Sequence, residues 1–371
     1  MSKAFIITNP MIAANKSAEV TLSKFLRVIK PCYEKIIVIG GNLTIEEDLQ
    51  DVELRSFDIA RSNKKIKRIV DILRIQIRMC FAINKAIGKN DQVFFWIADK
   101  MILPFELVKR KGAEINYFIY GNMTKEGNSS MFSKISSKLV RYMAEHADYI
   151  CMESKSVITE WMDLKVKQMR IIHLYADSFE LNPINERKKI FGMVCRLSAS
   201  KHVLECIEAM AKIHEIYPEW KLEIIGSGKL QRECETLINR LDSAEYIELF
   251  GWIAHDKIIN ISKSWKYLLF PTDTEGMPNG LIEMMACGIP ALASPVGGIK
   301  DILLDKVNGI YLKECSAETI ADGMISAIEM EKNNDRYSNM VEQAYAAVKN
   351  EFTLQMAQEC TLKELCNGEN A

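Results

Sequence analysis

The sequence predicts an α/β protein built from two doubly wound domains. Its 371 residues exceed what one hydrophobic core usually holds and fit two domains of about 150–200 residues. Hydrophobic residues make up 48% of the chain, which is enough for globular packing. Short β-branched runs alternate with helical patterns in both halves. This alternation is typical of parallel sheets that are covered by helices on both faces.

The first half, residues 1–180, is expected to form one such domain. Its predicted strands are 4–8, 35–39, 93–97, 115–120 and 148–153, with helices over 17–29 and from about 154. Ligands are expected at the carboxyl ends of these strands. The polar segment 122–137 follows one of them. It reads equally well as a mobile acceptor-binding loop or as a plain connection.

The second half restarts after the polar stretch 174–189, and we assign residues 181–353 to the second domain. Its predicted strands are 190–195, 222–225, 246–249 and 267–270, with helices at 203–214 and about 231–241. A glycine turn, Gly226-Ser227-Gly228, follows the second of these strands.

Residues 64–86 have the pattern of a basic amphipathic helix. The apolar residues at helical spacing are Ile66, Ile69, Val70, Leu73, Ile77, Cys80 and Phe81. The basic residues, set against the single acid Asp71, are Lys64, Lys65, Lys67, Arg68, Arg74, Arg78 and Lys85. Two interpretations stay open: a core helix with a solvated basic stripe, or a basic face that meets anionic lipid on the inner membrane surface. Nucleic acid is not expected, because no aromatic residues interleave with the charges.

Charge and cysteine usage narrow the class of protein. The formal net charge of −1 argues against a general polyanion binder. The ten cysteines are scattered without metal-ligand spacing, as expected for free thiols in a reducing cytosol. No signal-peptide pattern and no apolar run of ~18 residues is present. We therefore expect a cytoplasmic protein that can attach peripherally to a membrane.

The stretch 271–298 carries most of the candidate chemistry. It reads as a strand end, a polar loop with Glu275, a short helix with Pro278 at its first position, a second strand and a glycine turn. Backbone amides at such a helix N-terminus can bind hydroxyl oxygens or phosphate. Glu283 lies one turn into the helix, where its carboxylate can accept hydrogen bonds from a vicinal diol.

Arg196 and Lys201 bracket a second strand-to-helix turn, C-R-L-S-A-S-K-H. Both cations are expected at one strand end, beside a helix N-terminus. Positive charge, the guanidinium fork and the helix dipole together favour a diphosphate at this place.

These motifs carry a family resemblance. E-G-M-P-N-G-L-I-E, with seven residues between its outer glutamates, resembles the EX7E signature of retaining glycosyltransferases of family 4, which have the GT-B fold. A-C-G-I-P-A-L-A-S-P-V-G-G-I-K-D-I-L and N-G-I-Y-L continue the pattern. R-L-S-A-S-K resembles the family's G-R-L-x-x-x-K-G, with His202 in place of its last glycine. The resemblance implies two Rossmann-like domains that face a central cleft. It also implies a terminal helix within 354–371 that packs back on the first domain.

The resemblance also implies residue roles. Arg196 and Lys201 would stabilise the departing diphosphate, Glu275 would lie by the transferred sugar, and Glu283 would bind the ribose. The further donor-binding residues would be Gly276, Met277, Pro278, Asn279, Gly226, Gly228, Trp252, Ile253, Gly297 and Gly298. No metal and no cofactor is expected, because the two cations neutralise the leaving group.

The expected function is transfer of a hexosyl group, with retention, from a UDP- or GDP-sugar to a glycan or lipid-linked acceptor in cell-surface polysaccharide biosynthesis. Two departures from the family pattern concern the first domain. The loop 8–13 has no glycine, and Tyr120-Gly121-Asn122 stands where many members carry a histidine. These departures motivate the alternative, a catalytically silent GT-B partner subunit.

Overall fold

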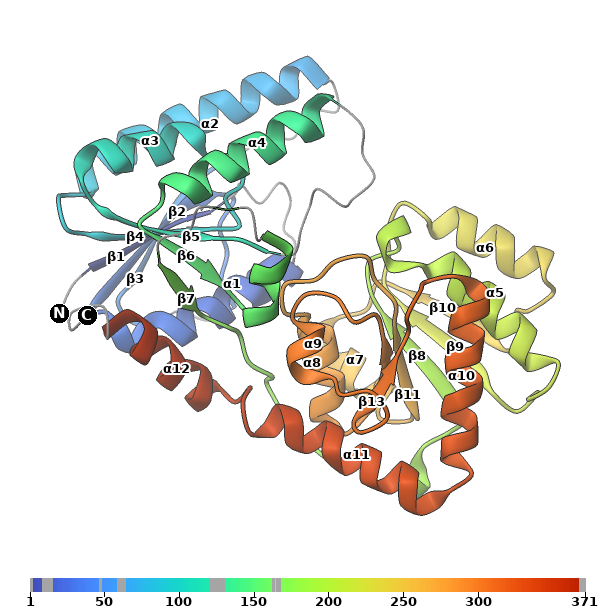
Figure 1. Ribbon diagram of the computed structural model, residues 1–371. Helices are drawn as coiled ribbons and strands as arrows, with labels where there is room; N and C mark the ends of the chain where they lie inside the picture. The colour runs from blue at the N-terminus through green and yellow to red at the C-terminus, as the bar shows by residue number, and fades with distance from the viewer. Residues whose placement is uncertain are drawn as a thin grey trace. The chain divides into compact units, whose positions relative to one another are not determined.

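The computed structural model describes residues 3–8, 16–46, 49–58, 65–120, 131–161, 164 and 168–366. Contacts within the chain divide it into two compact units. The first comprises Met1–Leu174 together with Ala357–Ala371, and the second comprises Tyr175–Met356 (Figure 1).

The first unit is built on a parallel sheet of seven strands in the order β3-β2-β1-β4-β5-β6-β7. The strands are β1 (Lys3–Thr8), β2 (Lys35–Gly41), β3 (Val52–Phe57), β4 (Gln92–Trp96), β5 (Glu114–Phe118), β6 (Tyr149–Met152) and β7 (Met169–Ile171). Helices α2 (Lys65–Ala86), α3 (Ile102–Lys111) and α4 (Met131–His146) cover one face, and α1 (Lys16–Ile29) and α12 (Leu354–Cys366) lie on the other (Figure 1). In α12, Gln358 donates to the Arg27 carbonyl at 2.9 Å.

The second unit is built on a parallel sheet of six strands in the order β10-β9-β8-β11-β12-β13. The strands are β8 (Ile190–Val194), β9 (Lys221–Ile225), β10 (Ile247–Gly251), β11 (Tyr267–Phe270), β12 (Ala291–Ala293) and β13 (Gly309–Tyr311). The helices are α5 (Val203–His214), α6 (Gln231–Arg240), α7 (His255–Ser262), α8 (Asn279–Ala286), α9 (Ile299–Ile302), α10 (Ala317–Glu331) and α11 (Asn334–Lys349).

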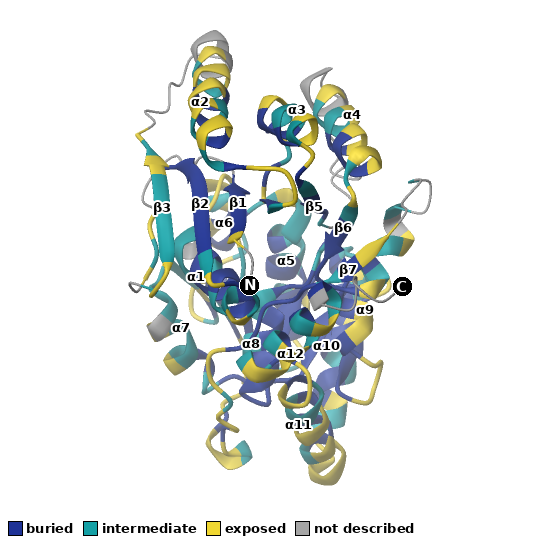
Figure 2. Ribbon diagram, turned by 90° about the vertical axis from the view of Figure 1, so that its left-hand side faces the viewer, coloured by how far each residue is buried: buried dark blue, intermediate teal, exposed yellow. Residues whose placement is uncertain are grey.

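Alternation along the strands divides the core of the second unit between the two sheet faces. Phe191 and Leu269 pack into one hydrophobic cluster, while their neighbours Ile190 and Leu268 pack into the other. Both faces of this sheet are therefore covered by apolar side chains. Figure 2 shows the same burial in the first unit, where β1 and β2 are dark blue, while the edge strand β3 is mostly intermediate. The prediction of two doubly wound domains is confirmed.

The structure corrects the prediction for residues 122–137. Residues 121–130 lie outside the described part of the chain, but α4 begins at Met131 and continues through residue 137. A helix forms here because Val140, Met143 and Ala144 supply a buried face. These residues follow the polar segment 122–137, which does not itself show an apolar helical pattern.

The apolar pattern predicted for residues 64–86 does form a helix, α2, but the expected face is not the buried one. From residue 70 onward, where its side chains are described, the buried residues are Ile75, Gln76, Met79 and Ile83. Four of the residues assigned to the apolar stripe are exposed instead, namely Val70, Leu73, Ile77 and Phe81, and we call them the α2 apolar stripe. Gln76 is buried because its side-chain oxygen accepts a hydrogen bond from the amide of Leu103 in α3, at 3.0 Å.

None of the described helices combines the length and the apolar character that crossing a bilayer requires. The nine cysteines whose side chains the structure describes are free thiols.

Candidate active site

The strand order of the second unit reverses between β8 and β11, which pair directly through Leu268 and Gly192. The loops that leave the carboxyl ends of these two strands therefore diverge to opposite sides and leave room between them. Ligands of open α/β sheets gather at such a switch point. The segments 195–202 and 271–278, which hold most of the predicted residues, begin here.

Lys201 and Glu275 meet at this point. Lys201 lies in a short 3-10 helix, Ala199–Lys201, and its ammonium group forms an ion pair with the Glu275 carboxylate. The same ammonium group donates to the Thr272 hydroxyl at 3.1 Å. The Lys201 and Glu275 side chains are 21% and 16% exposed, so a ligand can reach a cation and an anion that are already desolvated in part.

Glu283 forms a second pairing, which the sequence did not predict. Its carboxylate is 12% exposed and lies 3.0 Å from Nε2 of His255, at the start of α7. A carboxylate oxygen of Asp177 completes a group whose donor atoms all lie within 4.8 Å of one another. One imidazole and two carboxylates are a ligand set suited to a divalent cation such as Zn²⁺. No sequence signal links the three residues, because they come from three separate segments.

The N-terminus of α8 differs in detail from the prediction. Pro278 is the N-cap, with extended backbone, and Asn279 is the first helical residue. The first amide to donate within this turn is that of Leu281, which bonds the Pro278 carbonyl at 3.1 Å. The side chain of Met277 is buried in the core, so Met277 can face a ligand only through its backbone.

The predicted glycines are required by close backbone packing. A Cβ atom on Gly226 would lie 1.8 Å from the carbonyl oxygen of Cys195, and one on Gly228 would lie 2.2 Å from that of Leu197. A Cβ atom on Gly297 would lie 1.8 Å from the carbonyl oxygen of Glu275. These glycines therefore let the turns at 226–228 and 297–298 press against the segments that carry the charged residues.

Gly298 is one of the residues expected to bind the donor, but its amide is not free for a ligand. It donates to the carbonyl of Gly276 at 2.8 Å. This bond ties the 297–298 turn to the loop that carries Glu275.

The remaining predicted residues are accessible. Arg196 is exposed, and within the described residues it forms no ion pair. Trp252 follows the end of β10 and is 59% exposed, while Ile253 packs partly against the core. The first-domain departures fall mostly outside the described residues, at 9–13 and at Gly121-Asn122.

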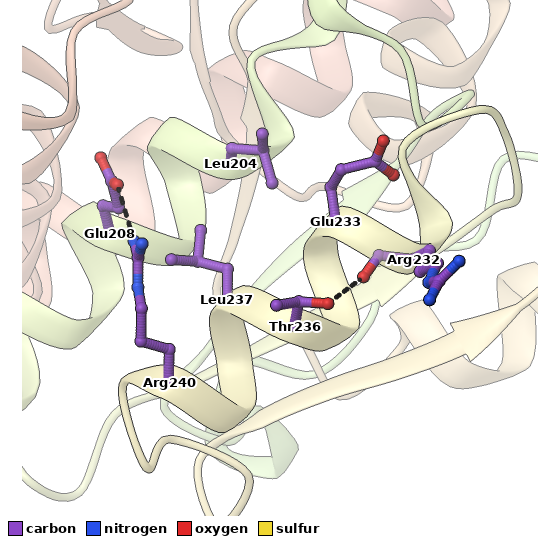
Figure 3. Close-up of a pocket in the computed structure, with 7 residues that line it drawn as sticks. All are labelled: Leu204, Glu208, Arg232, Glu233, Thr236, Leu237 and Arg240. Atoms are coloured by element: carbon purple, nitrogen blue, oxygen red, sulfur yellow. Dashed lines mark hydrogen bonds and ion pairs between the residues drawn. The ribbon is translucent and has the colours of Figure 1, made fainter.

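A groove of about 450 Å³ lies between α5 and α6 (Figure 3). It is lined by Leu204, Glu208, Arg232, Glu233, Thr236, Leu237 and Arg240. Arg240 points across it toward Glu208, at 4.0 Å. The charges of the lining compensate one another and no predicted site residue lines the groove, so we assign it no ligand.

Comparison with known proteins shows what this chain is similar to. Residues 176–346 match the family model described as glycosyl transferases group 1. An uncharacterized glycosyltransferase of Methanocaldococcus jannaschii is 25% identical over 214 residues, which are 57% of this chain and 59% of that relative. The chain thus spans less than two thirds of that relative's length.

Solved structures extend the likeness to the whole chain. Sucrose-phosphate synthase from Thermosynechococcus elongatus has a TM-score of 0.80 at 14% identity, with 100% of this chain and 99% of that chain covered. Anabaena HepE in complex with UDP-glucose has a TM-score of 0.76 at 14% identity, with 99% and 100% covered. At such identities the likeness concerns the fold alone, and it confirms the GT-B fold.

Proposed function

We propose that this chain, whose residues 176–346 match the family model described as glycosyl transferases group 1, moves a hexosyl group from a nucleotide-diphosphate sugar to a glycan or lipid-linked acceptor with retention. The observation that carries this proposal is the meeting of Lys201 and Glu275 at the switch point between β8 and β11. A cation for the leaving diphosphate and an anion for the sugar stand side by side there. Membership of family 4 is part of the proposal.

Each charged residue has a role that its surroundings support. Lys201 leaves Glu275 to meet the diphosphate, and the exposed Arg196 adds a guanidinium fork. The released Glu275 carboxylate then faces the positive charge that develops at the anomeric carbon. Glu283 exchanges its contact with His255 for the two ribose hydroxyls. Neutralisation by these cations makes a metal ion or a cofactor unnecessary.

Backbone groups and one aromatic side chain complete the proposed donor site. The amides of Gly276, Met277 and Asn279, with Pro278 at the cap, would bind sugar hydroxyls at the N-terminus of α8. The turn at Gly226 and Gly228 and the turn at Gly297 and Gly298 would border the nucleotide and the sugar. Trp252 would stack on the base, with Ile253 beside it, because an exposed indole at a strand end has a free π face.

The chemistry we propose is a substitution on one face of the sugar. The bond between the anomeric carbon and the diphosphate oxygen breaks, and the acceptor hydroxyl attacks from the same side. Its proton passes to the departing diphosphate, which the cations stabilise. The fold neighbour HepE was solved with UDP-glucose, which favours a UDP-sugar as the first donor to try. We place the reaction in cell-surface polysaccharide biosynthesis.

We further propose that the first unit attaches to the inner, anionic face of the plasma membrane through the α2 apolar stripe. Phe81 in this stripe is 68% exposed, and the exposed cations Arg74, Arg78 and Lys85 lie on the same helix. Apolar side chains can enter the headgroup region, and each cation contributes about 1 kcal/mol near an anionic surface.

Sedimentation with vesicles tests this attachment. Vesicles that contain phosphatidylglycerol should bind the protein, and those of phosphatidylcholine alone should bind it weakly. Phe81→Ser should reduce binding, whereas Leu304→Ser, at an exposed position of the second unit, should not. Equal binding of both variants would argue against the α2 apolar stripe as the contact.

A thermal-shift screen against UDP, GDP and their sugar conjugates tests the donor proposal. A ligand at 100 times its Kd stabilises the folded state by about 2.7 kcal/mol, which raises Tm measurably. Slow hydrolysis of the stabilising nucleotide sugar would then establish turnover. Binding without any hydrolysis or transfer would favour the silent partner subunit, and the absence of any shift would refute both.

A further inference from the structure

His202 is held in a backbone conformation that histidine seldom adopts. It joins the 3-10 helix Ala199–Lys201 to α5, with φ 48° and ψ 39°, in the left-handed region. A glycine meets no steric penalty there, whereas a residue with a Cβ does. Such strain persists where the surroundings determine the conformation strongly. The contacts of the imidazole ring show what determines it here.

The ring touches three different parts of the second unit. Its Nε2 atom lies 2.8 Å from a carboxylate oxygen of Asp273, in the loop after β11. Its Nδ1 atom lies 3.5 Å from the carboxylate of Glu205 in α5. The Cys315 side chain, beyond β13, lies near the ring and raises its pKa. The side chain is only 17% exposed, so these contacts enclose it.

Further hydrogen bonds hold the loop at 272–273 in place. The amide of Asp273 donates to the Ser200 carbonyl at 3.1 Å, and the amide of Thr272 donates to the Ser294 hydroxyl at 2.9 Å. The Ser294 hydroxyl in turn lies 3.2 Å from the Cys315 sulfur. The loop that carries Glu275 is therefore fastened to the helix that carries Lys201 through both backbone and side chains.

We propose that His202 is a positioning residue, whose imidazole fastens the Asp273 loop to the Ala199–Lys201 helix and so sets Glu275 opposite Lys201. The role in transfer rests on the proposed function, but the fastening itself does not. It deepens that function by adding a residue that touches neither the sugar nor the diphosphate. His202 contacts Asp273, and through Asp273 it affects Glu275, two positions further along the chain.

The charge of the ring makes the fastening dependent on pH. The nearby Cys315 side chain and the hydrogen bond with Asp273 raise the pKa of His202 to about 9, although burial opposes the charged form. The groups that face the ring are Asp273 from the β11 loop, Glu205 from α5 and Cys315 from beyond β13, with Lys201 next along the chain. The ring is thus a cation at neutral pH and loses its charge-assisted bond to Asp273 as the pH passes about 9.

Hydrogen–deuterium exchange on the unliganded protein tests the fastening directly. His202→Gly removes the ring and leaves a residue that favours the same backbone conformation, so the variant should fold. At pH 7 the peptide that contains residues 271–276 should exchange about tenfold faster than in the wild type. His146→Asn, on α4 in the first unit, is the matched control and should leave this peptide unchanged. Unchanged exchange in His202→Gly would overturn the proposal.

The pH profile of donor turnover tests whether the charge of the His202 imidazole matters for activity. Wild-type kcat should fall as the pH rises through about 9. His202→Asn tolerates the left-handed backbone and keeps a donor to Asp273 without titrating, so it should retain most activity and lose this fall. His202→Gly should lose about tenfold in kcat at pH 7. The same alkaline fall in all three proteins would overturn the role of the ring. A wild type that binds no nucleotide sugar would instead refute the proposed function and leave the exchange result standing.

Discussion

Replacing Glu283 by Gln gives the sharpest test of the donor site, because it keeps the shape and removes the charge. In the structure the carboxylate is 12% exposed and already bonded to His255 at 3.0 Å. Two ribose hydroxyls would each form a charge-assisted hydrogen bond worth roughly 1.5–3 kcal/mol. The displaced His255 side chain is 37% exposed, so losing that contact costs no more than about 1 kcal/mol.

The amide of Gln keeps one acceptor and loses the charge, so about 2–3 kcal/mol of donor binding should disappear. This corresponds to a Kd for the nucleotide that is higher by about 30- to 150-fold. Isothermal titration with the nucleotide that stabilises the wild type measures it, and circular dichroism checks the fold. Glu208→Gln, in the groove of Figure 3, is the matched control and should keep the wild-type Kd. A Kd within threefold of the wild type for Glu283→Gln would refute the assignment of the ribose to this residue.

Three further outcomes are expected. Lys201→Ala should lower kcat by about 10²–10³-fold with a smaller change in nucleotide Kd, because it removes charge stabilisation of the leaving group; unchanged single-turnover rates would contradict this. Gly297→Ala should lower Tm markedly, because the new Cβ atom would lie 1.8 Å from the Glu275 carbonyl oxygen and the residue has a φ of 47°. Gly88→Ala is the control and should not lower Tm, because its Cβ atom would lie 3.6 Å from its nearest neighbour. Equal Tm values for the two variants would show that the turn at Gly297 relaxes. The pKa of His202 in the folded protein is about 9, above the ordinary histidine value of about 6.5. Protonation of His202 should therefore stabilise the wild type relative to His202→Asn. This extra stability should be complete below about pH 6.5 and lost as the pH rises through about 9. Urea unfolding at pH 6, 8 and 10 measures that difference, and a constant difference would contradict the contact with Asp273.

The predicted architecture and the observed one agree where the signal is periodic and long. Alternating strands and helices of the second half predicted β8, β9 and β11 close to their observed bounds. The prediction missed β3, Val52–Phe57, because an edge strand is only half-buried and its sequence V-E-L-R-S-F carries polar side chains on one face. It also gave α2 the wrong buried face, because helical spacing identifies apolar positions but not the surface against which the helix packs.

The sequence alone determined the two doubly wound sheets and the local turns that place Lys201 and Glu275 each just after a strand, because these depend on residues close together in the chain. Only the tertiary structure decided which distant groups meet. The contact of His255 with Glu283, the approach of Asp177, and the enclosure of the His202 ring by Asp273, Glu205 and Cys315 all join separate segments. The order of strands in the sheet brings such segments to a common edge, and no spacing within the sequence records that order.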